Sequence, residues 1–295
     1  MSASGEPKLR IGLPKGSLQE TTQKLFAKAG FDVRMSSRSY YPDIDDDEIE
    51  CILMRPQEMA RYVAQGVIDC GITGLDWVLE TGADVEELAD LRAPWPNYGP
   101  VRWVLAVKEG SPFEKVEDLA GKRIAAEAVG MTTRYLAQKG ITANVEFSWG
   151  ATEVKPPLLA DAIVDVSETG SSLRANDLDV LDVVLTSTPR FIAKQTACPD
   201  AGKRAKMDRL LLLLQGAIAA ATRGCLAMNV PRDRLDAVLA ILPSLGTATI
   251  STLADEAWVD VTAVVEEKTV RDLIPRLKEA GARGILAAPP HKLSD

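Results

Sequence analysis

The 295-residue chain contains a single histidine, His291, which lies close to its last residue. A histidine-based catalytic triad or a metal site with several histidines is therefore excluded. Any catalysis must instead use carboxylates, cationic side chains, hydroxyls and backbone dipoles. Cysteine is also scarce, since Cys51, Cys70, Cys198 and Cys225 are dispersed and show no CxxC spacing. This pattern predicts free or buried thiols in a reducing cytoplasm.

Long apolar runs are missing as well. The first residues, MSASGEPKLRIGLPKG, have no apolar core, so we expect no secretory signal. No stretch approaches the roughly 20 apolar residues of a membrane span. Basic residues are fewer than acidic ones, 34 against 42, which gives the chain a net charge of −8. This deficit argues against nonspecific nucleic-acid binding, although local lysines and arginines could still build an anion site.

The remaining composition, 46% hydrophobic and 26% charged, is that of a globular protein long enough for two or three domains. Apolar runs alternate with amphipathic segments through the first two thirds of the chain, which predicts an α/β fold with short connections. The turn-rich stretch 93–100 resembles a hinge between two such sets. Strands are expected at 8–13, 50–54, 69–73, 101–107, 123–126, 145–148, 161–166, 181–187 and 191–193, and helices at 17–29, 56–65, 75–80 and 132–138.

The last third follows a different pattern. One long helix is expected over 202–223. After it the order strand, helix, strand, strand, helix, strand predicts a ferredoxin-like sandwich over 225–287. A module of about 75 residues is small enough to be a sensor attached to a catalytic body. The acidic run 43–50 is interpreted as a solvated loop.

The most informative segment runs from Leu159 to Asn176. Its apolar strand carries Asp165 and is followed by Glu168 and by the turn Thr169-Gly170-Ser171-Ser172, after which a helix could begin. Backbone N–H groups, hydroxyls and a helix N-terminus suit a phosphate. The carboxylates could hold sugar hydroxyls or Mg²⁺, so a phosphorylated sugar would satisfy both halves. The alternative is an ordinary corner with Ser171 or Ser172 as the N-cap.

Further polar residues follow other predicted strands. Open α/β sheets bind ligands at the carboxyl ends of their strands, so joint placement there favours a site. Singly, each residue could be a solvated cation or a turn glycine. They are Lys15, Arg55 and Glu153, together with the turn that contains Gly71, Thr73, Gly74 and Asp76.

The chain resembles the ATP phosphoribosyltransferase family, the first enzyme of histidine biosynthesis, in its long, self-regulated form. The segments that carry the resemblance are LRIGLPKGSL, MRPQEMARYVAQGVIDCGITGLDWV, GKRIAAEAVGMTTRYLAQKG, VEFSWGATEVKPPLLADAIVDVSETGSSLRANDL and LPSLGTATISTLADEAWVDVTAVV. The last of these indicates the long form. The resemblance implies a two-lobed, periplasmic-binding-protein-like α/β body with a C-terminal ferredoxin-like βαββαβ regulatory domain. The implied divisions are 1–100 with 187–214, 101–186, and 215–295.

By this resemblance, adenine N1 of ATP displaces pyrophosphate from C1 of phosphoribosyl pyrophosphate, with Mg²⁺ bound through the substrate phosphates. Adenine N1 already carries a lone pair, so no strong base is required. Candidate catalytic residues are Asp165, Glu153, Lys15 and Arg55. The implied donor loop consists of Glu168, Thr169, Gly170, Ser171, Ser172 and Leu173. The nucleotide side is assigned to Gly71, Thr73, Gly74 and Asp76.

The resemblance also implies feedback inhibition by histidine and a homo-oligomer, from dimer to hexamer. The implied inhibitor pocket consists of Asn229, Leu245, Thr247, Thr249, Val264 and Gly284. Four places depart from the family pattern. Thr247-Ala248-Thr249 replaces the common Ser-Pro-Thr, and Gly150-Ala151-Thr152-Glu153 replaces a GSVE-type segment. Glu127-Ala128 replaces a basic or aromatic pair, and Ser172 replaces a threonine, which keeps the hydroxyl.

Two other functions fit parts of the sequence. A prephenate-dehydratase-like enzyme also joins a two-lobed body to a regulatory module, but it needs no phosphate loop with upstream acids. A two-lobed solute-binding protein would use the hinge-like stretch. However, such a receptor has no need of the βαββαβ tail, and we expect no export signal in this chain.

Overall fold

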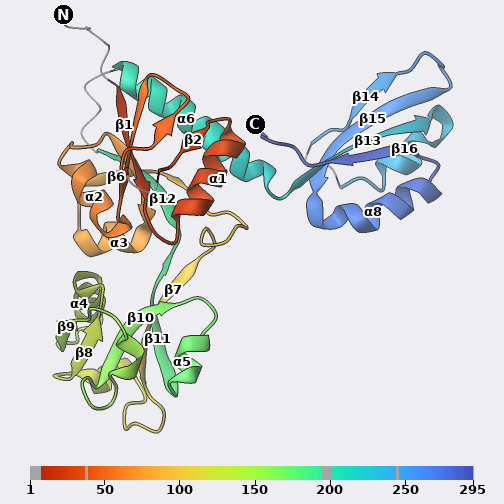
Figure 1. The fold of residues 1–295 in the computed structure, drawn as a ribbon. Helices are drawn as coiled ribbons and strands as arrows, with labels where there is room; N and C mark the ends of the chain where they lie inside the picture. Colours follow the sequence, from red (N-terminus) through yellow and green to blue (C-terminus); the bar gives the residue numbers. More distant parts are fainter. Residues whose placement is uncertain (1–7, 37–38, 195–200, 244–245, 295) are drawn as a thin grey trace, which may run out of the picture. The chain divides into compact units, whose positions relative to one another are not determined.

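The computed structural model describes residues 8–36, 39–194, 201–243 and 246–294 (Figure 1). The chain forms two compact units. The first comprises Met1–Lys24 and Phe31–Asp208, and the second Leu25–Gly30 and Arg209–Asp295. Within the described ranges, no helix has both the length and the apolar character needed to cross a membrane.

The first unit contains two five-stranded sheets. One has the order β4-β1-β5-β12-β6, with β1 parallel to β4 and β5, and β12 antiparallel to its neighbours. Buried side chains such as Ile11, Leu13 and Ile72 form its core. Its elements are β1 (Leu9–Pro14), α1 (Gln19–Ala29), β4 (Ile49–Met54), α2 (Pro56–Ala64), β5 (Cys70–Gly74), α3 (Leu75–Thr81), β6 (Val85–Asp90) and β12 (Pro189–Lys194).

The other sheet has the order β11-β7-β10-β8-β9, with β10 parallel to β8 and antiparallel to β7. Trp103, Leu105, Ile124 and Val164 are buried in its core. Its elements are β7 (Val101–Lys108), β8 (Arg123–Ala126), α4 (Val129–Gln138), β9 (Asn144–Phe147), β10 (Ala162–Ser167), α5 (Ser171–Ala175) and β11 (Leu178–Ser187). Short 3-10 helices lie at Val116–Leu119 and Thr152–Val154.

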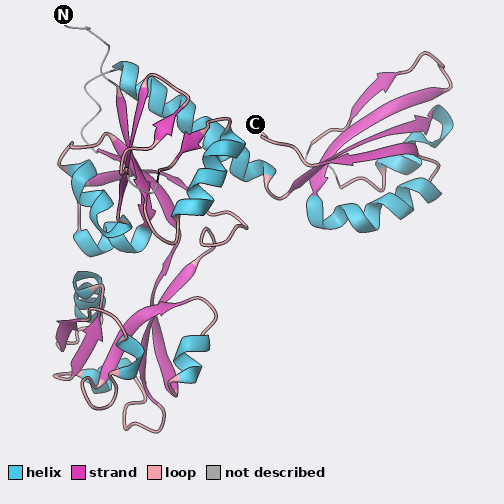
Figure 2. Ribbon diagram, in the orientation of Figure 1, coloured by secondary structure: helices cyan, strands magenta, loops and turns pink. Residues whose placement is uncertain are grey.

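The second unit contains a four-stranded antiparallel sheet of order β14-β15-β13-β16 (Figure 2). Along β13 and β15, alternate residues such as Leu226, Met228, Val259 and Val261 are buried in one core. The predicted βαββαβ order is thus confirmed. The elements are β13 (Arg223–Pro231), a 3-10 turn (Arg232–Arg234), α7 (Leu235–Leu239), β14 (Thr249–Thr252), β15 (Trp258–Glu266), α8 (Glu267–Glu279) and β16 (Arg283–Ala288). Helix α6 (Ala201–Ala220) belongs to the first unit up to Asp208 and to the second from Arg209, and the last residues of α1 also belong to the second unit.

The α/β class, the two sheets of the body and the C-terminal sandwich therefore agree with the sequence analysis. The domain limits 1–100 with 187–214, 101–186 and 215–295 stay a prediction. Strand β6 is not among the expected elements, because its sequence VEELAD has few strongly apolar residues. Two-residue strands β2 (Val33–Arg34) and β3 (Asp43–Ile44) also pair with each other.

The acidic run 43–50 is not simply a solvated loop. The Nζ atom of Lys206 lies 2.6 Å from Asp46 Oδ2 and 2.5 Å from Glu48 Oε2. Lys206 and Asp46 are both largely shielded from solvent, so these contacts fix the run against the start of α6. The partner is about 160 residues away in the chain, which explains why charge patterning alone missed it.

Cys51 and Cys70 are buried, Cys225 is partly buried, and none of the three forms a disulfide. Burial raises the pKa of the Cys51 thiol to about 12, which keeps it protonated and unreactive. Cys198 lies outside the described residues.

Candidate active site

A pocket of about 320 Å³ lies in the first unit, where the carboxyl ends of the two sheets meet. The residues that follow β1, β4, β5, β8 and β10 all reach it, as expected for an open α/β sheet. Five predicted site residues are in its lining: Lys15, Arg55, Gly74, Asp76 and Glu168.

The first sheet provides a cationic wall. Lys15 and Arg55 follow β1 and β4 directly and are exposed to solvent. The Nζ atom of Lys15 lies 4.0 Å from the centre of the Tyr40 ring. The starts of α1 and α2 lie on the same wall, and neither Lys15 nor Arg55 has a carboxylate within ion-pair distance in the described chain. Free backbone N–H groups at helix N-termini add partial positive charge, so this wall favours anions.

The second sheet provides an acidic wall. Glu127 follows β8 and Glu168 follows β10, and both side chains are exposed. Gln57, from the first sheet's wall, donates from Nε2 to Glu127 Oε1 at 3.3 Å. The pocket therefore has cationic and anionic sides, which suits a ligand with both phosphates and hydroxyls or a bound cation.

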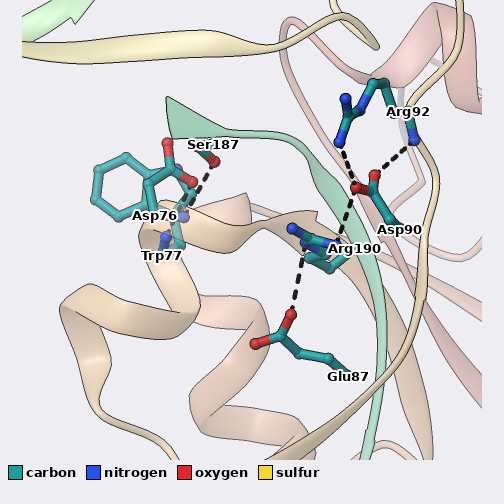
Figure 3. A network of polar contacts seen from close by, with 7 residues as sticks. All are labelled: Asp76, Trp77, Glu87, Asp90, Arg92, Ser187 and Arg190. Carbon is teal, nitrogen blue, oxygen red and sulfur yellow. Dashed lines mark hydrogen bonds and ion pairs between the residues drawn. The ribbon is translucent and has the colours of Figure 1, made fainter. Parts of the chain in front are cut away.

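Asp76 is a buried carboxylate held from several directions (Figure 3). Its Oδ2 accepts a 2.8 Å hydrogen bond from Trp103 Nε1 and its Oδ1 accepts one of 2.9 Å from the Trp77 backbone N–H. The Asp76 backbone N–H donates to Ser187 Oγ at 3.1 Å. Burial raises the pKa of Asp76, although these hydrogen bonds oppose the shift. Asp76 thus ties the start of α3 to β7 and to the end of β11.

Gly74 permits this arrangement. A Cβ atom at that position would lie 2.0 Å from Asp76 Oδ1. Gly71 is similarly required by packing, since a Cβ there would lie 2.5 Å from the sulfur of Met59. Thr73 is fully buried and donates from Oγ1 to the Pro56 carbonyl at 2.8 Å. Gly71 and Thr73 therefore support the pocket from beneath rather than line it.

An ion-pair network braces β12, whose first residue lines the pocket. Arg190 contacts Glu87 at 3.5 Å and Asp90 at 3.1 Å, and Arg92 contacts Asp90 at 3.2 Å (Figure 3). Burial alone would raise the pKa of Asp90, but hydrogen bonds from Arg92 and the charge of Arg190 lower it overall. The network fixes β12 against β6 and holds Ser187 and Thr188 in place beside Asp76.

The turn after β10 has the conformation that its sequence suggests. Gly170 adopts φ +71°, and α5 begins at Ser171. Gly170 occupies the N-cap position without a side-chain hydrogen bond, so neither Ser171 nor Ser172 is the N-cap. Thr169 Oγ1 and Ser171 Oγ lie 3.0 Å apart, and Arg174 Nη1 donates to the Thr169 carbonyl at 3.2 Å. Leu173 is buried and anchors α5.

Glu153 connects a second loop to this turn. Its Oε1 accepts a 2.7 Å hydrogen bond from Ser172 Oγ. The Glu153 loop is held by a hydrogen-bonded chain in which Lys155 Nζ donates to Ser148 Oγ at 2.6 Å, and Ser148 Oγ lies 2.7 Å from Thr152 Oγ1. Backbone hydrogen bonding and the Ser172 hydroxyl lower the pKa of Glu153, so it stays ionised.

Asp165 is half-buried on β10, next to these carboxylates. Its Oδ1 accepts a 2.7 Å hydrogen bond from the Val166 N–H. Burial raises the pKa of Asp165, and the nearby charges of Glu153 and Glu127 raise it further. Asp165 and Glu153 lie outside the lining of the 320 Å³ pocket, but they share its edge of the sheet with Glu127 and Glu168.

The lining also contains polar residues that the sequence analysis did not select: Gln57, Asn97, Glu127, Ser187 and Thr188. Glu127 had the same signal as Lys15 and Arg55, a position just after a buried strand. Ser187 ends β11 and Thr188 precedes β12, with no turn motif between them. Only their contacts with the start of α3 in the structure identify them as residues of the site. Among the described residues, no group of three histidine, cysteine or acidic side chains is arranged to hold a metal ion.

The residues implied for a histidine pocket lie in the second unit. Asn229, Thr249 and Val264 are on the sheet face opposite the core, with Thr249 paired with Thr262. A Cβ on Gly284 would lie 3.7 Å from Asn229 Nδ2, so these two residues are neighbours. Thr247 is exposed, and Leu245 lies outside the described residues.

Two family models match the chain. The model of ATP phosphoribosyltransferase matches residues 55–216, and that of the C-terminal domain of the same family matches residues 220–292. The two matches together include both sheets of the body in large part and the four-stranded sheet of the second unit.

Curated relatives agree. A protein from Thermodesulfovibrio yellowstonii named ATP phosphoribosyltransferase is 55% identical over 97% of this chain and 98% of its own length. One of the same name from Prosthecochloris aestuarii is 55% identical over the full length of both chains. Among solved structures, an ATP phosphoribosyl transferase (HisG:HisZ) complex from Thermotoga maritima has a chain 27% identical, with a TM-score of 0.59, covering 70% of this chain and 98% of that one.

Proposed function

Because the chain belongs to the ATP phosphoribosyltransferase family, in its long form with a C-terminal domain, we propose that the 320 Å³ pocket is where the pentosyl transfer occurs. The protein is an enzyme that condenses ATP with phosphoribosyl pyrophosphate in the first step of histidine biosynthesis. The observation that carries the assignment of the site is the opposition of a cationic wall and an acidic wall across one pocket.

The phosphates are divided between two places. The 5-phosphate of the donor binds the turn Thr169–Ser172, where Gly170 has a left-handed conformation and the hydroxyls of Thr169 and Ser171 lie 3.0 Å apart. The pyrophosphate binds toward Lys15 and Arg55 and the N-termini of α1 and α2. The negative charge of the pyrophosphate is then balanced by the positive charge of this wall, which favours binding of the donor.

The ribose lies between these groups, beside Asp165 and Glu168. As the bond from C1 to pyrophosphate breaks, the ring gains positive character, and a nearby carboxylate stabilises it. Glu153 supports this arrangement by holding Ser172, so it orients the donor loop. Adenine N1 attacks C1 with its own lone pair, which agrees with the lack of a histidine base.

Enzymes of this kind typically use a divalent cation, and we infer Mg²⁺. The described residues offer no three-residue cluster for a metal, so the substrate phosphates supply most ligands. Glu127 and Glu168 give the pocket the negative charge that a phosphate-bound cation would face. The cation, when bound, neutralises the pyrophosphate as it leaves.

The nucleotide is assigned to the part of the pocket near α3. Gly74 and Asp76 line this part, while Gly71 and Thr73 fix the strand below it. Because Asp76 is committed to Trp103 and Trp77, we assign it a positioning role rather than a direct contact with the base.

The test measures pyrophosphate release from ATP, phosphoribosyl pyrophosphate and Mg²⁺ in wild type and in Lys15→Met. The matched control is Lys24→Met, on the exposed face of α1, where Lys24 pairs only with Glu20. At a donor concentration below KM, we expect slow pyrophosphate release in Lys15→Met, because its donor KM is raised, and a normal rate in the control. Equal rates in all three proteins would show that the transfer does not use this pocket.

We further propose a cytoplasmic homo-oligomer that is inhibited by histidine bound to the exposed sheet face around Asn229, Thr249 and Gly284. Thr249→Val keeps the shape but removes a hydroxyl that faces the ligand. It should raise the inhibition constant while kcat stays unchanged, because the active site lies in the other unit. Thr252→Val, on the same strand, is the control. Equal inhibition of all three proteins would contradict the assignment.

A further inference from the structure

The second unit contains its own pocket, of about 840 Å³, which the activity described so far does not use. It lies where β13 ends, where β15 and β16 begin, and beside the last turn of α8. Its lining combines the cations Arg234, Lys278 and Arg283 with Trp258, Ile274 and one acid, Asp233.

The three cations lack the carboxylate partners that two other arginines of this unit have. Arg223 pairs with Glu266, and Arg271 with Asp272 at 3.7 Å. In the described part of the chain, no carboxylate oxygen lies within 4.0 Å of a side-chain nitrogen of Arg234, Lys278 or Arg283. All three side chains are exposed and line one concave surface, where like charges attract an anion from solution.

The net charge of the pocket lining is positive, although the whole chain has a net charge of −8. Three full positive charges stand against the carboxylate of Asp233 and the partial negative charge, about half a unit, at the C-terminus of α8. A concave surface of one sign attracts counter-ions from solution. The positive charge of the lining therefore favours an anionic ligand.

The pocket also has a flat apolar component. The guanidinium carbon of Arg283 lies 5.5 Å from the centre of the Trp258 ring, so a planar cation stacks on an indole. Ile274 and Pro231 lie in the same lining. A planar heterocycle packs well against such a surface, and the guanidinium and ammonium groups suit phosphate oxygens.

We propose that this pocket is an effector site for a nucleoside phosphate, with its phosphates on Arg234, Lys278 and Arg283 and its base against Trp258. The site is separate from the catalytic pocket, which lies in the other unit. It is also different from the surface assigned to histidine, with which it shares only Gly284. Histidine carries little net charge near neutral pH and so would leave the three cations unpaired.

The experiment is hydrogen–deuterium exchange of the full chain with ADP as the probe, because peptides report the two pockets separately. ADP at saturation should slow amide exchange in 278–286. Arg234→Ala and Lys278→Ala should each raise the dissociation constant at this site about tenfold, the size expected for one lost charge-assisted hydrogen bond. Arg276→Ala, an exposed cation of α8 outside the lining, should behave as wild type.

The possible results separate clearly. Unchanged exchange in 278–286 with ADP would overturn the proposal. Protection that persists in both Arg234→Ala and Lys278→Ala would also overturn it, since the effect would then come from the catalytic pocket. Adenosine should protect weakly and inorganic pyrophosphate less than ADP. Equal protection by either of these probes would rule out a nucleoside phosphate as the ligand.

Discussion

The two walls of the catalytic pocket differ in how their charges are held. Lys15 and Arg55 project from the first sheet into solvent and lack an ion-pair partner among the described residues. Glu153 and Asp165, which extend the acidic wall beyond the pocket lining, are fixed by hydrogen bonds from Ser172 and from the Val166 N–H. The cationic wall is thus adaptable, whereas this extension of the acidic wall is preorganised.

This difference matches the two tasks of the transfer. The leaving pyrophosphate moves away during the reaction, so flexible cations can follow it. The ribose must present C1 to the adenine in one geometry, and rigid carboxylates stabilise the charge that develops there. Substitutions on the acidic wall should therefore lower kcat, and substitutions on the cationic wall should mainly raise KM.

The largest expected effect comes from Gly170→Val. A branched residue at φ +71° is strained by about 1–3 kcal/mol, and its Cβ would lie 3.0 Å from Arg174 Nη1. With the loss of backbone contacts to phosphate, donor affinity measured by calorimetry should fall at least about 100-fold. Gly140→Val has the same strain, at φ +73°, with no atom within 4 Å of the Cβ. Normal donor affinity in a folded Gly170→Val protein would refute the phosphate-loop assignment.

Asp165→Asn tests the rigid acidic wall. The carboxylate faces a ribose that becomes cationic, so kcat should fall about 100-fold, as for the loss of one electrostatic partner. Donor KM should change little, because the charge matters in the transition state. Asp179→Asn, an exposed residue of β11, is the control. A loss of only a few-fold in steady-state kcat would indicate a structural aspartate.

Much of this site could be predicted from local sequence. Lys15, Arg55 and Glu168 stand directly after apolar runs, and topology then brings such positions together. Asp76 was predicted as a nucleotide contact, but its main partner is Trp103, 27 residues away, and no local pattern reveals that hydrogen bond. Strand β6 was missed for a related reason: its sequence is acidic, and only pairing with β12 through Arg190 makes it a strand.

Arg55→Met tests the flexible cationic wall. Removing one charged contact to the pyrophosphate should raise donor KM about tenfold and change kcat much less. Arg61→Met, within α2 and paired with Glu58, removes the same charge away from the pocket and should have no effect. Initial rates at varied donor concentration separate the two parameters. If kcat fell as strongly as in Asp165→Asn, the two walls would not differ in the way proposed.

The smallest expected effect is a shift in the pH dependence of kcat/KM, which tests whether Asp165 is influenced by the charge of Glu127. Burial and the charges of Glu153 and Glu127 raise the pKa of Asp165 above its ordinary value of 3.8. As the pH falls through this raised pKa, Asp165 becomes protonated and kcat/KM should fall. Glu127→Gln removes one like charge and so lowers the pKa, which moves the acidic limb to lower pH by a fraction of a unit.

The raised pKa of Asp165 acts on stability in the opposite direction. Because the folded-state pKa is raised, ionisation of Asp165 opposes folding, and this cost should appear as the pH rises above 3.8 and be complete above the folded-state pKa. Glu127→Gln should reduce that cost, whereas Glu146→Gln, an exposed residue of β9, should not. The measurements are pH profiles of kcat/KM and urea unfolding for the three proteins. An acidic limb that does not move, or that moves to higher pH, would show that Asp165 does not feel Glu127, and the acidic wall would then be a set of independent carboxylates.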